Sequence, residues 1–289
     1  MKPDQRFIKQ PKNFWANVRS LSQKLGYTVR GTKQIKVFNT QDMVTGLQKL
    51  NLSAAHVATN GELTEFGRTL HDYFLHRAKV LNEYVRPRLM NKERAIQEFE
   101  ALYKELQPKC PIPLNKQRGE KKGQAYLTGI INMLLEQGIG TCDYDPRMLT
   151  TITRDDVPVR TLARRFDGAF PSSINPVAIW EVKEYYNTTT FGSRVADGVY
   201  ETLLDGMELE ELLEHEKVAV QHLLMVDGEF TWWQCGRSYL CRIIDILHMG
   251  YVDEVLFGYE VIEQLPRIAK QWVAIERRRT TNMIAQPRH

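Results

Sequence analysis

The feature that most constrains this chain is a series of short apolar segments that alternate with helical segments after residue 123. Helices place apolar residues three or four positions apart, whereas strands are short runs rich in β-branched and aromatic residues. Helices between successive strands are typical of an α/β fold in which helices flank a mixed central sheet. We therefore predict a helix at 124–137, strands at 148–153, 162–170, 177–186, 218–226 and 252–259, and helices from 193, at 233–249 and at 261–279.

The first 107 residues have a different pattern, and we expect a mainly helical, basic region there. Segments 41–50 and 63–85 place apolar side chains on one helical face, with Thr40 and Thr64 as expected caps. Basic helices joined by a turn are compatible with a helix-turn-helix or winged-helix DNA-binding region. A plain helical bundle is the alternative. Prolines and basic residues at 108–122 predict a linker, which leaves 123–289 as a second domain.

Charge is divided unevenly along the chain. Residues 1–122 contain 23 Lys and Arg against 11 Asp and Glu, whereas residues 123–289 contain 16 against 24. A basic front half suggests contact with a polyanion such as nucleic acid. A basic solvated surface without a partner is the alternative interpretation.

The composition argues against several classes of protein. No segment approaches the roughly 20 apolar residues of a membrane-spanning helix. The first residues carry charges where a signal peptide has its apolar part, so we expect a cytoplasmic protein without a membrane partner. The four cysteines lack CxxC spacing, which favours reduced thiols over a zinc site or a disulfide framework.

The segment ARRFDGAFPSSINPVAIWEVKEYY, residues 163–186, carries the chemistry. In an antiparallel hairpin centred on Ile174, Asp167 lies opposite Glu181, because both are seven positions from the centre. Lys183 shares the face of Glu181, since side chains repeat every two residues along a strand. Two adjacent carboxylates, with the Val182 carbonyl as a further ligand, favour Mg²⁺. The alternative is an exposed strand with a cross-strand ion pair, next to an Asp-Gly turn.

At these residues the sequence resembles the PD-(D/E)XK nuclease superfamily, the fold of many type II restriction endonucleases. Asp167 and Glu181-Val182-Lys183 match the motif, fourteen positions apart, although Phe166 stands where the family has proline. The resemblance covers roughly 123–260. It implies a restriction-endonuclease-like core, catalysis by Asp167, Glu181 and Lys183, and Mg²⁺ with Mn²⁺ as a substitute. It also implies an acid on the first helix of the core, for which we suggest Glu136.

Residues after the third strand are candidates for contact with DNA. Tyr185 and Asn187 offer aromatic and amide groups beside the expected metal site. Ser193 is expected to cap the following helix, whose N-terminus favours phosphate, and Arg194 lies in its first turn. An ion pair of Arg194 with Asp197 or Glu201 is the alternative.

The sequence therefore predicts a magnesium-dependent endonuclease that hydrolyses phosphodiester bonds of double-stranded DNA. A type II restriction endonuclease acting as a homodimer is the leading interpretation, because two active sites are the simplest way to cut both strands. Two alternatives stay open. One is a structure-specific nuclease of repair or recombination, and the other is a DNA-binding protein that keeps the fold without catalysis.

Overall fold

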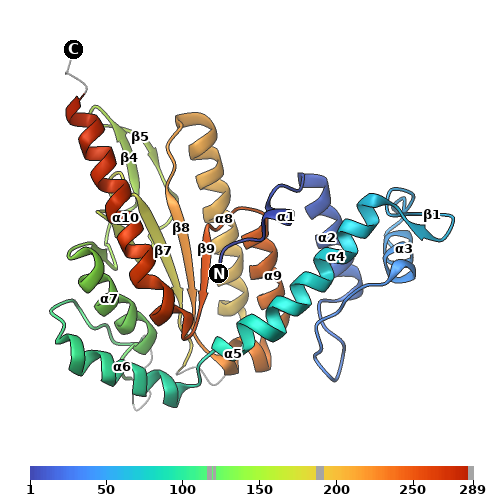
Figure 1. Ribbon diagram of the computed structural model, residues 1–289, viewed down its shortest axis with the longest axis horizontal. Coiled ribbons are helices and arrows are strands. Elements are labelled where there is room, and N and C mark those ends of the chain that lie inside the picture. The colour runs from blue at the N-terminus through green and yellow to red at the C-terminus, as the bar shows by residue number, and fades with distance from the viewer. Residues whose placement is uncertain (116–118, 120–121, 187–191, 286–289) are drawn as a thin grey trace.

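The computed structural model describes residues 1–115, 119, 122–186 and 192–285. Figure 1 shows a central sheet with helices on both sides, and a helical part that extends from it. This architecture confirms the coarser part of the predicted fold class, a mixed central sheet flanked by helices with a mainly helical N-terminal region. No helix among the described residues is long and apolar enough to cross a membrane.

The N-terminal part is helical except for one short hairpin. Its core is aromatic, and Phe14, Trp15 and Tyr73 meet edge to face. Thr64 caps α4 as predicted, because its hydroxyl accepts a hydrogen bond from Gly67 N–H. The cap of α3 is Asn39 and not Thr40, since Asn39 and Asp42 form a reciprocal capping box. The elements are α1 (Gln5–Ile8), α2 (Lys12–Leu25), α3 (Thr40–Gln48), β1 (Ala58–Thr59), β2 (Glu62–Leu63), α4 (Glu65–Lys79), the π-helical η1 (Val80–Val85) and α5 (Arg86–Arg88).

The central sheet has the strand order β3-β6-β7-β8-β9. Antiparallel pairing joins the first three of these strands, and parallel pairing joins the last three. Parallel neighbours need a helical crossover, and α8 and α9 supply the two connections. The strands are β3 (Asp143–Tyr144), β6 (Gly168–Phe170), β7 (Ala178–Lys183), β8 (Gln221–Val226) and β9 (Glu254–Phe257), with α8 (Ser193–Glu216), η3 (Glu229–Cys235) and α9 (Arg237–His248) between the later ones.

The strand expected at 148–153 does not belong to this sheet. β4 (Thr151–Arg154) pairs with β5 (Val157–Thr161) in a separate two-stranded hairpin. Asp155 and Asp156 both have positive φ angles, the backbone that a two-residue hairpin turn requires. Similarly, the expected strand at 162–170 is regular only over β6, so Asp167 lies just before the strand.

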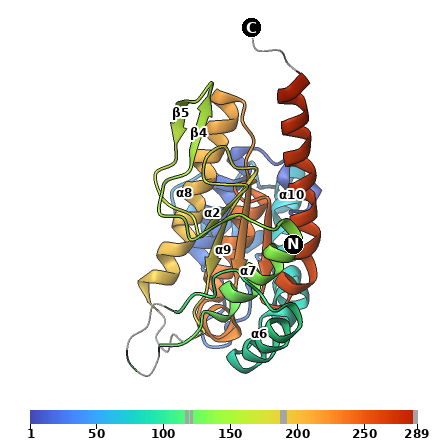
Figure 2. The same cartoon turned by 90° about the vertical axis from the view of Figure 1, so that its left-hand side faces the viewer.

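Helices cover the two faces of the sheet differently, as Figure 2 shows for α10 and α8. On one face, α6 (Lys92–Leu106), α7 (Tyr126–Ile139) and α10 (Glu260–Ala285) pack on Trp180, Met225 and Leu256. On the other face, α8 and α9 pack on alternate residues of the same strands, such as Leu224 and Val255. This alternation sends Trp180 and Val182 of β7 to the first face, and Ile179 to the side of α8.

The N-terminal part is joined to the sheet part through a buried polar contact. Arg77 of α4 is fully buried and pairs with Asp245 of α9 at 3.0 Å. The hydroxyl of Tyr73 donates to the same carboxylate. Two buried charges that neutralise each other this way hold the two parts in one arrangement, because separating them would leave an unpaired charge.

Candidate active site at the end of the β6–β7 hairpin

The hairpin has the register predicted from the sequence. Gly168 pairs with Trp180 and Phe170 with Ala178, so the two strands are symmetric about Ile174. The regular pairing ends at Gly168, and the next residue, Asp167, donates its N–H to the Trp180 carbonyl at 3.1 Å. A Cβ atom on Gly168 would lie 2.0 Å from the Trp180 ring. Only glycine therefore fits beside Asp167.

Asp167 fixes the end of the hairpin through its side chain. Its Oδ2 accepts a hydrogen bond from Val182 N–H at 2.7 Å, while the rest of the side chain is only partly buried. The N–H and C=O of one strand residue point to the same side of the strand. The Val182 carbonyl therefore points toward Asp167 and away from β8, where it is placed to act as a ligand.

Glu181 and Lys183 lie side by side on the face that α8 covers. Both are buried, and Lys183 Nζ lies 3.0 Å from Glu181 Oε2. The same ammonium lies 3.2 Å from Glu201 Oε2 on α8. α8 comes close here because Gly198 has no side chain: a Cβ atom there would lie 3.2 Å from the Lys183 side chain.

A second cation, Arg164, also contacts Glu181. Arg164 lies between β5 and β6, and its Nη2 is 2.6 Å from Glu181 Oε1. Its Nε is 3.0 Å from Asp205 Oδ1 on α8. Neither contact has the angles of a hydrogen bond, so both are electrostatic ion pairs. The site thus consists of two cations and four carboxylates, those of Asp167, Glu181, Glu201 and Asp205.

Burial changes the acidity of these groups. Burial and then the Asp167 carboxylate raise the pKa of Glu181 from 4.5 to about 8, a net value that already includes the opposing effects of Lys183 and Arg164. Burial also raises the pKa of Asp205 to about 7, against the effect of Arg164. For Lys183, burial lowers the pKa, but the carboxylates of Glu181, Asp167 and Glu201 together outweigh this effect and the net pKa is raised. Such shifts are common at catalytic sites.

The residues that could hold a metal are Asp167, Glu181 and the Val182 carbonyl. No cluster of three or more His, Cys, Asp or Glu ligands occurs among residues 1–115, 119, 122–186 and 192–285. Mg²⁺ does not require such a cluster, because it binds through one or two carboxylates and keeps several waters. The oxygen-only donor set and the raised pKa of Glu181 beside Asp167 fit this ion. A divalent cation there would relieve the repulsion between the two carboxylates.

Glu136 does not contact these residues. It lies on α7, as expected, but both of its carboxylate oxygens accept from the Lys109 N–H, at 3.0 and 3.2 Å. The acid that contacts the start of α7 is the partly buried Glu184, whose Oε2 accepts from the backbone N–H and the hydroxyl of Thr128. In the described structure Glu136 thus holds the segment before α7 and has no contact with Glu181.

The candidate DNA contacts have different environments. Tyr185 is partly buried, and its hydroxyl donates to the Arg194 carbonyl at 3.2 Å. Arg194 is exposed in the first turn of α8, as predicted, and forms no ion pair with described residues. Ser193 does not cap α8: it is the first helical residue, and Gly192 takes the cap position without a side-chain bond. Asn187 lies outside the described residues.

Sequence reasoning missed Arg164, Glu201 and Asp205 as members of the site. Their only signal was the placement of Glu201 and Asp205 four residues apart, which puts both on one face of α8. Nothing in the sequence indicated that this face would be turned toward Lys183.

Comparisons with protein families divide the chain in two. Residues 1–84 match a domain of unknown function, DUF7690, and residues 90–272 match another, DUF7687. The division falls at α5, whereas the expected linker at 108–122 lies inside the second match. Comparison with curated proteins and with solved structures gives no match for this chain. Because the second family covers more than half of the 289 residues, the chain belongs to the family of domains of unknown function DUF7687.

Proposed function

We propose that this protein is a magnesium-dependent nuclease that hydrolyses phosphodiester bonds in DNA. The observation that carries the proposal is the meeting of Asp167, Glu181 and Lys183 at the end of one hairpin, with Lys183 Nζ 3.0 Å from Glu181. The element order also supports it: α7, the antiparallel strands β3, β6 and β7, then α8 and the parallel strand β8. We assign a restriction-endonuclease-like core to these elements on that ground.

In the proposed mechanism, Asp167, Glu181 and the Val182 carbonyl hold Mg²⁺, with Mn²⁺ as a substitute. The ion would supply charge neutralisation for the phosphate and increase the acidity of a bound water. The ammonium of Lys183 orients the attacking water and stabilises negative charge that develops on the phosphate oxygens. Water attacks phosphorus in line with the leaving 3′-oxygen, so the new end carries a 5′-phosphate. Arg164 must move away from Glu181 before both carboxylate oxygens of Glu181 can bind the metal.

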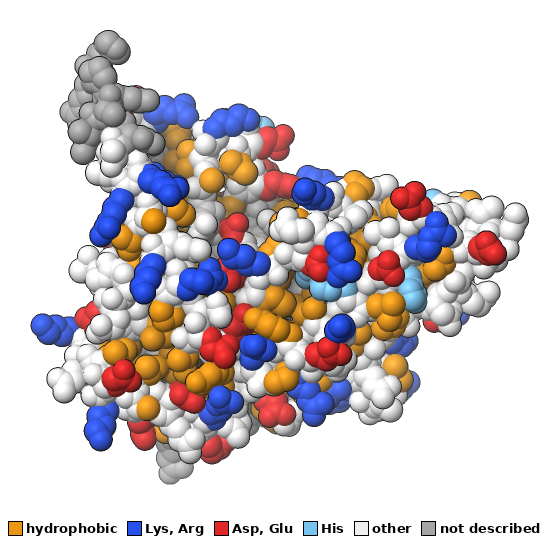
Figure 3. All heavy atoms as spheres, viewed as in Figure 1, with side chains coloured by type: hydrophobic (Ala, Val, Ile, Leu, Met, Phe, Trp, Pro, Cys, Tyr) orange, Lys and Arg blue, Asp and Glu red, His pale blue; other side chains and the backbone are white. Residues whose placement is uncertain are grey.

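Double-stranded DNA is the proposed substrate because the first 122 residues carry the excess of basic residues. On the face in Figure 3, lysines and arginines are spread over the sheet part and the helical part, among acidic residues. Cutting both strands is simplest for a homodimer, and a type II restriction enzyme of the cytoplasm remains our leading assignment. Tyr185, Asn187, Ser193 and Arg194, which follow β7, are proposed to contact the DNA backbone.

A catalytically idle DNA-binding protein is the second candidate, and one observation favours it. Both oxygens of Glu181 are already contacted by cations, Arg164 at 2.6 Å and Lys183 at 3.0 Å. If both ion pairs persist, the charge of Glu181 is already neutralised by the protein and no metal is required. The two candidates therefore differ in whether Mg²⁺ displaces Arg164.

Incubation with supercoiled plasmid, in Mg²⁺ and separately in EDTA, tests the proposal. We expect cleavage in Mg²⁺ and none in EDTA. Discrete fragments would indicate restriction, whereas a preference for branched substrates would indicate a repair nuclease. Retarded migration of intact plasmid in both conditions would reject catalysis and leave the DNA-binding candidate.

A further inference from the structure

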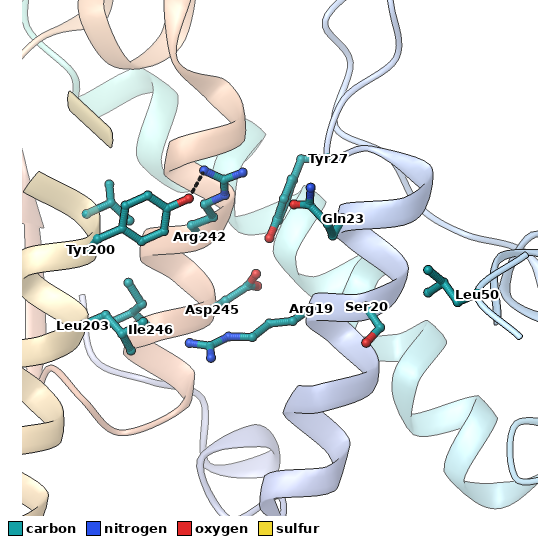
Figure 4. A pocket seen from close by; sticks show the side chains of 11 residues that line it. Arg19, Ser20, Gln23, Tyr27, Leu50, Tyr200, Leu203, Arg242, Asp245 and Ile246 are labelled. Carbon is teal, nitrogen blue, oxygen red and sulfur yellow. Dashed lines mark hydrogen bonds between the residues drawn. The ribbon is translucent and has the colours of Figure 1, made fainter. Parts of the chain in front are cut away.

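A cleft separate from the candidate active site lies between the N-terminal part and the sheet part. Its volume is about 470 Å³, and α2, α8 and α9 form its walls. Figure 4 shows Arg19 and Gln23 of α2 on one side, Tyr200 and Leu203 of α8 on the other, and Arg242 of α9 between them. The volume falls within the range of roughly 300–1,000 Å³ that is typical of small-molecule sites.

The cleft carries a net positive charge. Asp245 lines it, but Arg77 already pairs with this carboxylate at 3.0 Å. Among the described residues, neither Arg19 nor Arg242 forms an ion pair with a carboxylate. Arg242 instead donates to the Tyr200 hydroxyl at 3.1 Å. Two guanidinium groups on one cleft without acidic partners favour an anion with several oxygen acceptors, such as phosphate.

The rest of the lining favours a flat apolar group attached to that anion. The guanidinium of Arg242 lies 5.0 Å from the Tyr27 ring and 5.8 Å from the Tyr200 ring. Leu203 and Ile246 add aliphatic surface, and Gln23 adds an amide that can donate and accept. Tyrosine rings and the planar guanidinium of arginine stack with any of the nucleobases. An amide at the rim can bond to a base edge.

We propose that this cleft binds a nucleoside phosphate, with the phosphate between Arg19 and Arg242 and the base against the tyrosines. The cleft is joined to the candidate active site by α8, which supplies Tyr200 and Leu203 to one and Glu201 and Asp205 to the other. A nucleotide bound here would therefore contact the helix that carries two of the site's carboxylates. Free nucleotides and the terminal nucleotide of a strand share this chemistry, and the proposal is for the free nucleotide.

Isothermal titration calorimetry of the full chain without Mg²⁺ tests the proposal. The ligands are the common nucleoside 5′-monophosphates, each alone, then the corresponding nucleosides, inorganic phosphate and a short single-stranded oligonucleotide. We expect at least one monophosphate to bind about tenfold or more tightly than its nucleoside and than phosphate, because each half of the ligand has its own partners. Binding of the oligonucleotide alone, or of phosphate as tightly as any nucleotide, would overturn the proposal.

Two variants and a control locate the binding. Arg19→Gln removes an exposed charge and should weaken nucleotide affinity about tenfold, the loss of one charge-assisted contact. Ser20→Trp fills the cleft without changing its charge and should prevent binding. Arg278→Gln, at an exposed position on α10, should bind as the unchanged protein does. Unaltered affinity in Arg19→Gln would reject the site, and circular dichroism confirms that each variant is folded. The titration measures nucleotide binding and does not depend on cleavage. A negative titration therefore rejects the nucleotide site alone, and an absence of plasmid cleavage rejects the nuclease proposal alone.

Discussion

Arg164 Nη2 lies 2.6 Å from Glu181 Oε1, so a cation of the protein already covers the buried carboxylate of the candidate metal site. A buried carboxylate needs a nearby positive charge, and without a metal Arg164 and Lys183 supply it. If the protein binds Mg²⁺ as we propose, the ion would take the place of this guanidinium. Arg164 lies between β5 and β6, outside both strands, so this exchange does not require the sheet to change.

Replacement of Lys183 by Ala should abolish cleavage. We expect a fall of at least about 100-fold in the rate of plasmid cleavage, because the charge that stabilises the phosphate is removed, while DNA affinity is largely kept. Asp167→Asn and Glu181→Gln should lower the cleavage rate similarly, because each removes a carboxylate that is proposed to bind the metal. The control is Lys104→Ala, at an exposed position on α6. Near-normal cleavage by the Lys183 variant would show that the chemistry lies elsewhere.

The affinity for Mg²⁺ should rise with pH. Burial and the adjacent Asp167 raise the pKa of Glu181 to about 8. Below that pH the carboxyl group holds a proton that the metal must displace, so affinity should increase by up to about tenfold per unit between pH 6 and 8 and then level off. Calorimetric titration with Mn²⁺ or Mg²⁺ at pH 6, 7 and 8 measures this. A flat profile would mean that Glu181 is ionised throughout and does not limit binding.

Removal of Arg164 should destabilise the fold. Asp205 is 1% exposed and would lose its ion-pair partner, so we expect Arg164→Ala to lower the free energy of unfolding by about 1–3 kcal/mol. The neighbouring exposed Arg165→Ala is the matched control, with an expected change within about 0.5 kcal/mol. Urea denaturation measures both. In the Arg164→Ala protein, a second change, Asp205→Asn, should restore part of the lost stability. Equal stability of Arg164→Ala and Arg165→Ala would contradict this account.

Basic residues of the N-terminal part should contribute to DNA affinity. Changing Lys24, Arg30 and Lys49 to Gln removes three exposed charges that form no ion pair with described residues. If each contacts a phosphate, the slope of log K against log salt should fall by about 0.9 per residue. The control changes Lys270, Arg277 and Arg278, which are exposed in the acidic second half. Fluorescence anisotropy at several salt concentrations gives the slopes, and equal slopes for the two triple variants would assign the basic excess to surface solvation alone.

The register of the β6–β7 hairpin could be predicted from the sequence, because it depends on local rules. Side chains alternate along a strand, and a short connection fixes which residues face each other. The pairing of Gly168 with Trp180 follows from this register, and most helices and the strands β7, β8 and β9 also lie where the sequence predicts them. Cap positions differed by one residue at α3 and α8, where a neighbour on the chain takes the cap.

Contacts between distant segments could not be predicted in this way. Arg164 reaches Glu181 and Asp205 only because the chain before β6 folds over β7 and α8 turns its acidic face inward. The β4–β5 hairpin leaves the sheet although its sequence is strand-like, because β3 pairs with β6 instead. The cleft at Arg19 and Arg242 has α2 and α9 among its walls, and Arg77 of α4 links these two helices through Ser22 and Asp245. A sequence pattern specifies which face of an element is apolar or charged, but the partner of that face is determined by packing of the whole chain.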